Sequence, residues 1–390
     1  MIVRLAFILL ALCCARTATA QGWTAVDVGA GHTCALDAEG RAFCWGNNHR
    51  GELGARTPET CGHAHHPGQN PCYPSPSRTP LAVQGGLRFA SVSAGVNRTC
   101  GLDAGGRAFC WGKDIGSRDS ACAGGDVCSF APLPWAAGTT FRQLRAAEDA
   151  ICGVTSAGEG RCWRRVWNRP GLWVKEVIFP GERLAWLDRY ADWMNTEDHV
   201  TCAATEDGRA FCQGPNDFAQ LGAGDTVTHR GPVPVAGGGR YSQVRPWAMS
   251  ACGLTVEGEA RCWGAAEPRE RWPEGSPSRP EFFDCGYSAW CSTPRPVAAG
   301  LRFRALTHTR DRFCGVTREG EARCWTWDGD ARPVAPGLRF QALDASETHA
   351  CGLTAGGEVW CWGQGVDEAG DVNRRVRAPA PPTASRPSPP

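Results

Sequence analysis

The chain has 390 residues, with 41 basic against 40 acidic side chains, 49 glycines, 28 prolines, 22 cysteines and 17 tryptophans. A nearly neutral chain lacks the basic surface that nucleic-acid binding requires, so nucleic acid is not expected as a partner. The composition also excludes a collagen-like, coiled-coil or disordered protein.

The first twenty residues predict a secretory signal peptide. Arg4 precedes an apolar run over residues 5–14, and Ala18-Thr19-Ala20 supplies the small residues that a signal peptidase recognises. The run is too short to cross a membrane, and no later segment predicts a membrane span; a lipid anchor at Cys13 or Cys14 is the alternative. We therefore expect residues 1–20 to be removed and the protein to be exported, to the periplasm, the cell surface or the medium.

The rest of the chain repeats one unit seven times. In every unit two cysteines are ten residues apart and a glycine lies six residues after the first of them; in six units a tryptophan follows the second. An aromatic residue precedes the first cysteine by eleven positions in six units, whereas in the fourth unit Tyr190 and Trp193 are each displaced by one. The seven pairs are Cys34 and Cys44, Cys100 and Cys110, Cys152 and Cys162, Cys202 and Cys212, Cys252 and Cys262, Cys314 and Cys324, and Cys351 and Cys361.

Each cysteine pair predicts a disulfide-bonded β-hairpin. Pairing Asp37 with Arg41 leaves a three-residue loop that ends in Gly40, at the position where such a turn requires a positive φ. The same register places Cys34 opposite Cys44, close enough for a disulfide. Twenty cysteines remain after cleavage, an even number in an exported chain, which favours disulfides over reactive thiols. The separation of ten residues does not suit a zinc site.

The units also predict how the sheets assemble. A strand that starts with an aromatic residue precedes each hairpin, and a proline-containing segment that suits an edge strand follows it. Four strands and an average period of about 53 residues are typical of a propeller blade. The fold class is therefore all-β: a seven-bladed β-propeller of about 50-residue four-stranded blades over residues 21–378, followed by a disordered proline-rich tail over residues 379–390.

The segment from Ala30 to Gly54, AGHTCALDAEGRAFCWGNNHRGELG, resembles the regulator-of-chromosome-condensation (RCC1-like) repeat family, and the chain is similar to an exported, disulfide-rich variant of it. The resemblance covers residues 22–378 and implies a seven-bladed propeller. The Gly-x-Leu-Gly ending recurs only as Gly51–Gly54, with a relic at Ala219–Gly222. The family's nuclear exchange activity on a small GTPase is not expected of an exported, neutral chain.

Three further cysteine pairs lie outside the repeat, between the third strand and the proline strand of their blades: Cys61 and Cys72, Cys122 and Cys128, and Cys285 and Cys291. Because strands alternate in direction, these insertions are expected on the face opposite the glycine turns. Loops on a rigid scaffold commonly carry recognition, and aromatic residues dominate binding hot spots. The candidate partner-binding residues are Tyr73, Phe130, Phe282, Phe283, Tyr287 and Trp290; the alternative is that they pack beneath their own loops.

The sequence contains no Gly-x-Ser-x-Gly, His-Glu-x-x-His or phosphate-binding glycine loop. We expect no enzyme activity, no catalytic residues and no cofactor. His63, His65 and His66 lie between Cys61 and Cys72 and pose the question of a metal, although a disulfide is favoured there and no metal is predicted. The repeat tryptophans are expected to pack between blades rather than bind sugar, and His32 and His349 to be structural hydrogen-bonding groups.

These observations favour an exported, non-catalytic scaffold that binds a protein or another cell-surface macromolecule through its loop-decorated face. The alternatives are a secreted enzyme inhibitor of the propeller β-lactamase-inhibitor type, a carbohydrate-binding or carbohydrate-active propeller, and a structural envelope component tethered by the tail. The partner, the oligomeric state and the mode of ring closure are left open.

Overall fold

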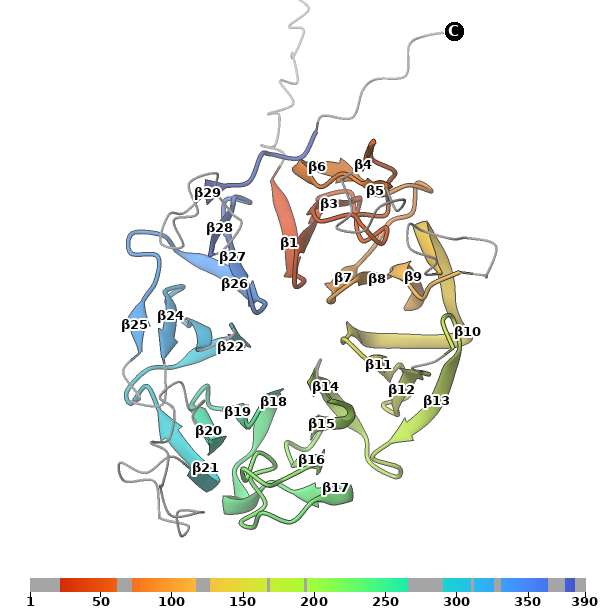
Figure 1. Ribbon diagram of the computed structural model, residues 1–390. Coiled ribbons are helices and arrows are strands. Elements are labelled where there is room, and N and C mark those ends of the chain that lie inside the picture. Colours follow the sequence, from red (N-terminus) through yellow and green to blue (C-terminus); the bar gives the residue numbers. More distant parts are fainter. Residues whose placement is uncertain are drawn as a thin grey trace, which may run out of the picture.

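The computed structural model describes residues 22–61, 72–116, 127–166, 169–192, 195–265, 290–309, 312–325, 331–363 and 376–382. In these ranges the regular structure consists of strands and one short 3₁₀ turn, Ala236–Gly238. The sheets stand around a common centre like the blades of a propeller (Figure 1). The predicted all-β propeller class is thus confirmed, and none of the described helical segments could cross a membrane.

Five sheets have four antiparallel strands, and each runs from an inner strand to an outer strand. The first contains β1 (Trp23–Val28), β2 (His32–Asp37), β3 (Ala42–Gly46) and β6 (Ser77–Ala82). The next two are β14 (Leu184–Asp192), β15 (Asn195–Thr205), β16 (Ala210–Gly214), β17 (His229–Pro234); and β18 (Tyr241–Trp247), β19 (Ser250–Thr255), β20 (Ala260–Ala265), β21 (Trp290–Val297). The last two are β22 (Phe303–His308), β23 (Phe313–Thr317), β24 (Ala322–Trp325), β25 (Arg332–Pro333); and β26 (Phe340–Ala345), β27 (His349–Thr354), β28 (Val359–Gly363), β29 (Val376–Arg377).

One larger sheet joins two repeat units through a long strand. Its order is β13 (Trp173–Ile178), β12 (Gly160–Arg165), β11 (Ala150–Thr155), β10 (Cys128–Ala146), β9 (Arg107–Lys113), β8 (Arg98–Leu102), β7 (Ser91–Ala94). The first part of β10 pairs with β9 and its last part pairs with β11. This strand therefore closes the second unit and opens the third. Counting the sheet as two blades makes seven in the ring, and counting it as one makes six.

Each hairpin has the register that the cysteine spacing predicts. In all seven, the first cysteine is directly opposite the second on the neighbouring strand. The two form a disulfide, with Cα atoms 4.0–4.1 Å apart. The bonds join Cys34 to Cys44, Cys100 to Cys110, Cys152 to Cys162, Cys202 to Cys212, Cys252 to Cys262, Cys314 to Cys324 and Cys351 to Cys361. Each disulfide is thus local to one hairpin.

The turn of the first hairpin also has the expected geometry. The Asp37 N–H donates to the Arg41 carbonyl at 3.1 Å, and the Gly40 N–H donates to the Asp37 carbonyl at 3.0 Å. Gly40 has a φ of 74°, as the predicted turn requires. The three-residue loop therefore places its glycine where the backbone is left-handed.

The same turns close the ring. We number the units 1 to 7 by their cysteine pairs in chain order. The carbonyl of each turn glycine accepts a backbone N–H at or near the start of the inner strand of the next unit. The donor is the first residue of the strand in five cases: Gly158 accepts from Leu184, Gly208 from Tyr241, Gly258 from Phe303, Gly320 from Phe340 and Gly357 from Trp23. Gly40 accepts from Phe89, two residues before β7, and Gly106 accepts from Phe141 within β10. The last of these bonds, at 2.8 Å, joins unit 7 to unit 1. Because β26–β29 form one sheet and β1–β3 with β6 another, the ring closes by packing and not by an exchanged strand (Figure 1).

The fourth unit differs from its prediction. Asp188 lies opposite Cys202, fourteen residues before it, whereas the equivalent residues elsewhere precede their cysteine by seven. The aromatic position of this unit is held by Leu184, so the assignment of Tyr190 and Trp193 to a repeat shifted by one was wrong. The physical reason is that the extra residues lengthen the hairpin between β14 and β15 without changing the register at the disulfide. Trp193 itself lies outside the described residues.

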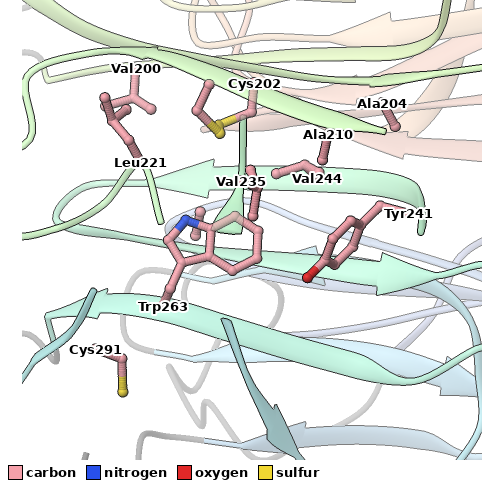
Figure 2. Close-up of a cluster of buried hydrophobic side chains, with 12 residues drawn as sticks. Val200, Cys202, Ala204, Ala210, Leu221, Val235, Tyr241, Val244, Trp263 and Cys291 are labelled. Atoms are coloured by element: carbon pink, nitrogen blue, oxygen red, sulfur yellow. A yellow bond between two sulfur atoms is a disulfide. The ribbon is translucent and has the colours of Figure 1, made fainter. Parts of the chain in front are cut away.

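Side chains of neighbouring units meet in apolar layers, of which Figure 2 shows the one between units 4 and 5. Trp263 is fully buried there against Val200, Leu221 and Tyr241. Its indole Nε1–H donates to the Gln220 carbonyl at 2.9 Å. In unit 2 the fully buried indole of Trp111 donates in the same way to unit 1. Packing between units is therefore confirmed for both tryptophans.

The predicted signal peptide lies outside the described residues. Of the predicted tail, residues 379–382 are described, and the Pro379 carbonyl accepts the Trp23 indole N–H at 3.1 Å. Both segments stay predictions.

Candidate functional site

One face of the ring carries both the inner turns and the predicted insertions. We call it the loop face: the end at which the first strand of each unit turns into the second. Because adjacent strands are antiparallel, the connection from the third strand to the fourth emerges on this face too. In unit 1 that connection contains the two-stranded sheet of β4 (Glu59–Cys61) and β5 (Cys72–Pro74). The glycine turns lie at the opposite end.

Two predicted partner-binding residues can be placed with their side chains. Tyr73, in β5, lies 5.6 Å from the His49 ring, centroid to centroid. Phe130, in β10, lies beneath the Arg56 guanidinium at 4.8 Å. Both side chains are half-buried, so each packs against a neighbour and keeps part of its surface accessible. Their role in binding stays a prediction.

The side chains of the other four candidates are not described. Phe282, Phe283 and Tyr287 lie outside the described residues. Trp290 begins β21, with its backbone opposite Ala265, and its side chain is not described. Of the six candidates, the structure therefore places only the side chains of Tyr73 and Phe130.

The extra cysteines are partly described. The backbone of Cys61 lies opposite Cys72 in the β4–β5 pair. Cys128 and Cys291 are disulfide-bonded, while Cys122 and Cys285, the partners predicted for them, lie outside the described residues. His63, His65 and His66 lie outside them as well. Among the residues that are described, no group of three or more His, Cys, Asp or Glu side chains is placed to hold a metal.

A cavity of about 420 Å³ lies where the seven inner strands converge, and sequence reasoning missed it. It is lined by the last residues of the inner strands and by the turns that follow them, so it belongs to the loop face. Pockets for small ligands typically enclose roughly 300–1,000 Å³. The cavity is therefore large enough for a side chain or a small molecule.

The centre of the ring contains one polar side chain from each unit, at the position opposite the first cysteine of the hairpin. These are Asp27, Ser93, Arg145, Asp188, Arg245, Thr307 and Asp344. All but Thr307 line the cavity, and Thr307 is buried beside it. We call these seven residues the floor.

Hydrogen bonds between units hold the floor in place. In four cases the side chain accepts a backbone N–H from the next unit: Asp27 from Ala94 at 2.6 Å, Ser93 from Ala146 at 3.1 Å, Thr307 from Ala345 at 3.0 Å and Asp344 from Val28 at 2.9 Å. The last bond again joins unit 7 to unit 1. Two of the four acceptors are buried carboxylates, and hydrogen bonds to charged groups are strong, so the floor reinforces four of the junctions that the glycine turns also bridge.

The charged residues of the floor compensate one another. Arg145 lies between two carboxylates, with Nη1 3.2 Å from Asp27 and Nε 3.9 Å from Asp188, and Arg245 approaches Asp188 at 3.0 Å. Burial disfavours the charge on Arg145, but the Asp188 and Asp27 carboxylates outweigh it and raise the guanidinium pKa. Burial raises the pKa of Asp188 to about 6 although Arg145 opposes the shift. Arg145 and Arg245 are thus both engaged in ion pairs with carboxylates of the floor.

The mouth of the cavity combines carboxylates with aromatic rings. Glu148 of unit 3 and Glu347 of unit 7 line it from the turns beyond the inner strands. Between units 4 and 6 the wall consists of Tyr190, Trp247 and His308, whose ring centroids are 4.6 Å and 4.2 Å apart in succession. The arrangement offers negative charge and apolar surface side by side.

Buried polar contacts support the turns around the mouth. Arg189 forms an ion pair with Asp149, with its Nε 3.1 Å from both carboxylate oxygens, and the two side chains are 0% and 4% exposed. Arg98 donates to the backbone carbonyls of Ala147 and Glu148 at 2.9 and 2.8 Å. These contacts hold units 2, 3 and 4 together directly beneath the cavity mouth.

The predicted structural role of the repeat histidines is confirmed. His32 Nε2 is 2.8 Å from the Thr99 hydroxyl of unit 2, and His349 Nε2 is 2.7 Å from the Thr33 hydroxyl of unit 1. Burial lowers the pKa of His32 to about 3 and that of His349 to about 4, so both rings are neutral at physiological pH. Each links two neighbouring units.

The comparisons with known proteins agree with this architecture. Residues 23–52, 89–114 and 340–367 match the Regulator of chromosome condensation (RCC1) repeat. The ultraviolet-B receptor UVR8 of Arabidopsis thaliana is 27% identical over 235 residues, which are 58% of this chain and 48% of the receptor, so the chain spans about half the length of this relative.

Two solved structures have a similar fold. Human WBSCR16 has a TM-score of 0.66 at 15% identity, with 87% of this chain and 95% of that one covered. Prp20p from Saccharomyces cerevisiae has a TM-score of 0.62 at 15% identity, with 90% and 88% covered. At these identities the likeness concerns the fold alone. The chain is thus a disulfide-rich β-propeller that carries repeats of the regulator-of-chromosome-condensation (RCC1) type.

Proposed function

We propose that this protein is an exported, non-catalytic scaffold that binds a partner protein through its loop face, with the central cavity inside the contact area. The observation that carries the proposal is that the cavity and the insertion of unit 1 belong to the same face of a ring that is clamped at its floor and at its glycine turns. A rigid face of this kind loses little freedom on binding, which favours affinity.

Three further observations support the proposal. Seven buried disulfides are stable in an oxidising compartment and rare in a reducing one, which favours export. The structural study of Prp20p describes its binding to Gsp1p and histones, so a propeller with this fold serves in protein binding elsewhere. The floor's charged groups are engaged in bonds between units, which suits a scaffold better than a reaction centre.

The test is to capture partners from the native envelope and medium on the immobilised mature chain, and to map the contact by cross-linking and mass spectrometry. We expect cross-links at the loop face. Tyr73→Ala and Trp290→Ala should weaken capture, whereas Arg88→Ala, beside the glycine turn of unit 1, should leave it unchanged. Cross-links confined to the glycine turns would refute the proposal. Capture of a hydrolase with nanomolar loss of its activity would instead support the inhibitor alternative.

A further inference from the structure

We propose that the mouth of the central cavity receives a basic side chain, lysine or arginine, projecting from the partner protein. This inference rests on the proposed function and specifies the chemistry of that same site. It is carried by the two mouth carboxylates, by the aromatic wall beside them, and by the lack of an ion pair at Glu148 among the described residues.

The two carboxylates reach the mouth from different units, and the turns of the two units between them in the ring supply only small or apolar residues above the floor. Units 1 and 2 contribute Gly29, Ala30 and Gly95 to this side of the lining. Burial, followed by the negative charges of Glu347 and Asp149, raises the pKa of Glu148 to about 7, while Arg98 and Arg165 oppose the shift more weakly. The ionised mouth therefore carries an electrostatic cost that a bound cation would remove.

The cations nearby do not neutralise Glu148. Arg145 and Arg245 are paired with the floor, and Arg189 is paired with Asp149. Arg98 points its Nη1 at backbone carbonyls. Within the described part of the chain, the Glu148 carboxylate itself makes no hydrogen bond or ion pair. The mouth is thus short of a positive charge at Glu148, and the two arginines of the floor are already engaged with its carboxylates.

The aromatic wall suits the rest of a basic side chain. Lysine and arginine combine an apolar stem with a charged head, and the head is attracted to aromatic faces. Trp247 lies between Tyr190 and His308, and all three line the cavity. Burial and the nearby Arg145 lower the pKa of His308 to about 3, so this ring stays neutral and does not repel a cation. Its buried Nδ1 has no hydrogen-bond partner among the described residues, which leaves one polar atom of the wall unsatisfied.

The decisive experiment compares two capped peptides, Gly-Gly-Lys-Gly-Gly and the same peptide with norleucine in place of lysine, because norleucine keeps the stem and lacks the charge. Binding to the full mature chain is measured by calorimetry and by saturation-transfer NMR. We expect the lysine peptide to bind at least tenfold more tightly than the norleucine peptide. An arginine peptide should behave like the lysine peptide, and calcium ions should not compete at equal concentration.

Variants assign the binding to the mouth. Glu148→Gln and Glu347→Gln should each weaken the lysine peptide several-fold and together remove the preference over norleucine. Glu39→Gln, on the glycine turn of unit 1, is the matched control and should change nothing. Between pH 6 and 8 the affinity of the native chain should rise, because Glu148 loses its proton near pH 7, and the rise should be smaller in Glu148→Gln. Circular dichroism confirms that the variants are folded.

The outcomes separate this inference from the proposed function. Equal binding of the two peptides, or a lysine preference that survives both glutamine substitutions, would overturn the basic-side-chain inference. If partner capture with loop-face cross-links persisted in that case, the proposed function would stand alone. Cross-links away from the loop face would reject the proposed function even if the lysine peptide bound at the mouth.

Discussion

Removing one hairpin disulfide tests the energetic basis of the fold. Cys152 and Cys162 are fully buried and ten residues apart in sequence. Closing a loop of about eleven residues restricts the unfolded chain by about 2.8 kcal/mol in the chain-entropy estimate. Replacing both cysteines by alanine should therefore lower the free energy of unfolding by about 3 kcal/mol, including a small packing loss.

Urea denaturation followed by tryptophan fluorescence measures this change. The midpoint should fall, and the dependence on urea should steepen slightly, because the opened chain exposes more surface when unfolded. All seven disulfides enclose loops of the same length, so together they account for about 20 kcal/mol by the same estimate. That sum exceeds the roughly 5–15 kcal/mol by which proteins are usually stable.

Complete reduction should consequently unfold the protein without denaturant. Far-ultraviolet circular dichroism in the presence of a strong reductant provides the readout. A loss below about 1 kcal/mol in the double variant, or a native spectrum after full reduction, would refute the reasoning that local disulfides hold the units together.

Three other substitutions probe separate parts of the structure. Gly40→Ala should destabilise the protein by more than the roughly 1–2 kcal/mol expected for a left-handed alanine, because its Cβ would lie 2.8 Å from a backbone oxygen of unit 2. Gly85→Ala has a similar φ and open space around its Cβ, so it measures the backbone strain alone. Equal losses of stability for the two variants in thermal unfolding would contradict the clash. Arg189→Met should lower the free energy of unfolding by about 3–5 kcal/mol, because Asp149 is left buried and unpaired. Adding Asp149→Leu should recover most of the lost stability. A double variant as unstable as the single one would contradict this account. Glu148→Gln should raise the free energy of unfolding at pH 8 and not at pH 5. The pKa of the Glu148 carboxyl is raised to about 7 in the folded state, so its stabilising contribution is lost as the pH rises through that value. A pH-independent difference in the urea midpoints of variant and native chain would contradict this prediction.

The hairpins could be predicted from the sequence because their determinants are local. The separation of Cys34 and Cys44 and the position of Gly40 decide turn, register and disulfide within eleven residues. The fourth unit shows where this reasoning fails. Extra residues between β14 and β15 shift the aromatic position to Leu184, and spacing to Cys202 alone cannot reveal which strand has been lengthened.

The cavity could not be predicted in the same way, because its parts come from different units. Glu148 and Glu347 are about two hundred positions apart in the sequence and meet only when the ring closes. A signal for the floor was nevertheless present: Asp27, Arg145 and Asp344 each stand seven residues before the first cysteine of their units. Polar residues at a position that should face the crowded centre of a propeller indicate bonds between units.

The central claim is that the loop face around the cavity is the binding surface, and hydrogen–deuterium exchange of the mature chain with and without its captured partner tests it most directly. The turns that form the cavity mouth, residues 28–31, 93–97, 145–149 and 344–348, should exchange more slowly in the complex, while the glycine turns around residues 40, 106, 158 and 357 should be unaffected. Protection confined to the glycine turns, with unchanged exchange at the cavity mouth, would contradict the account.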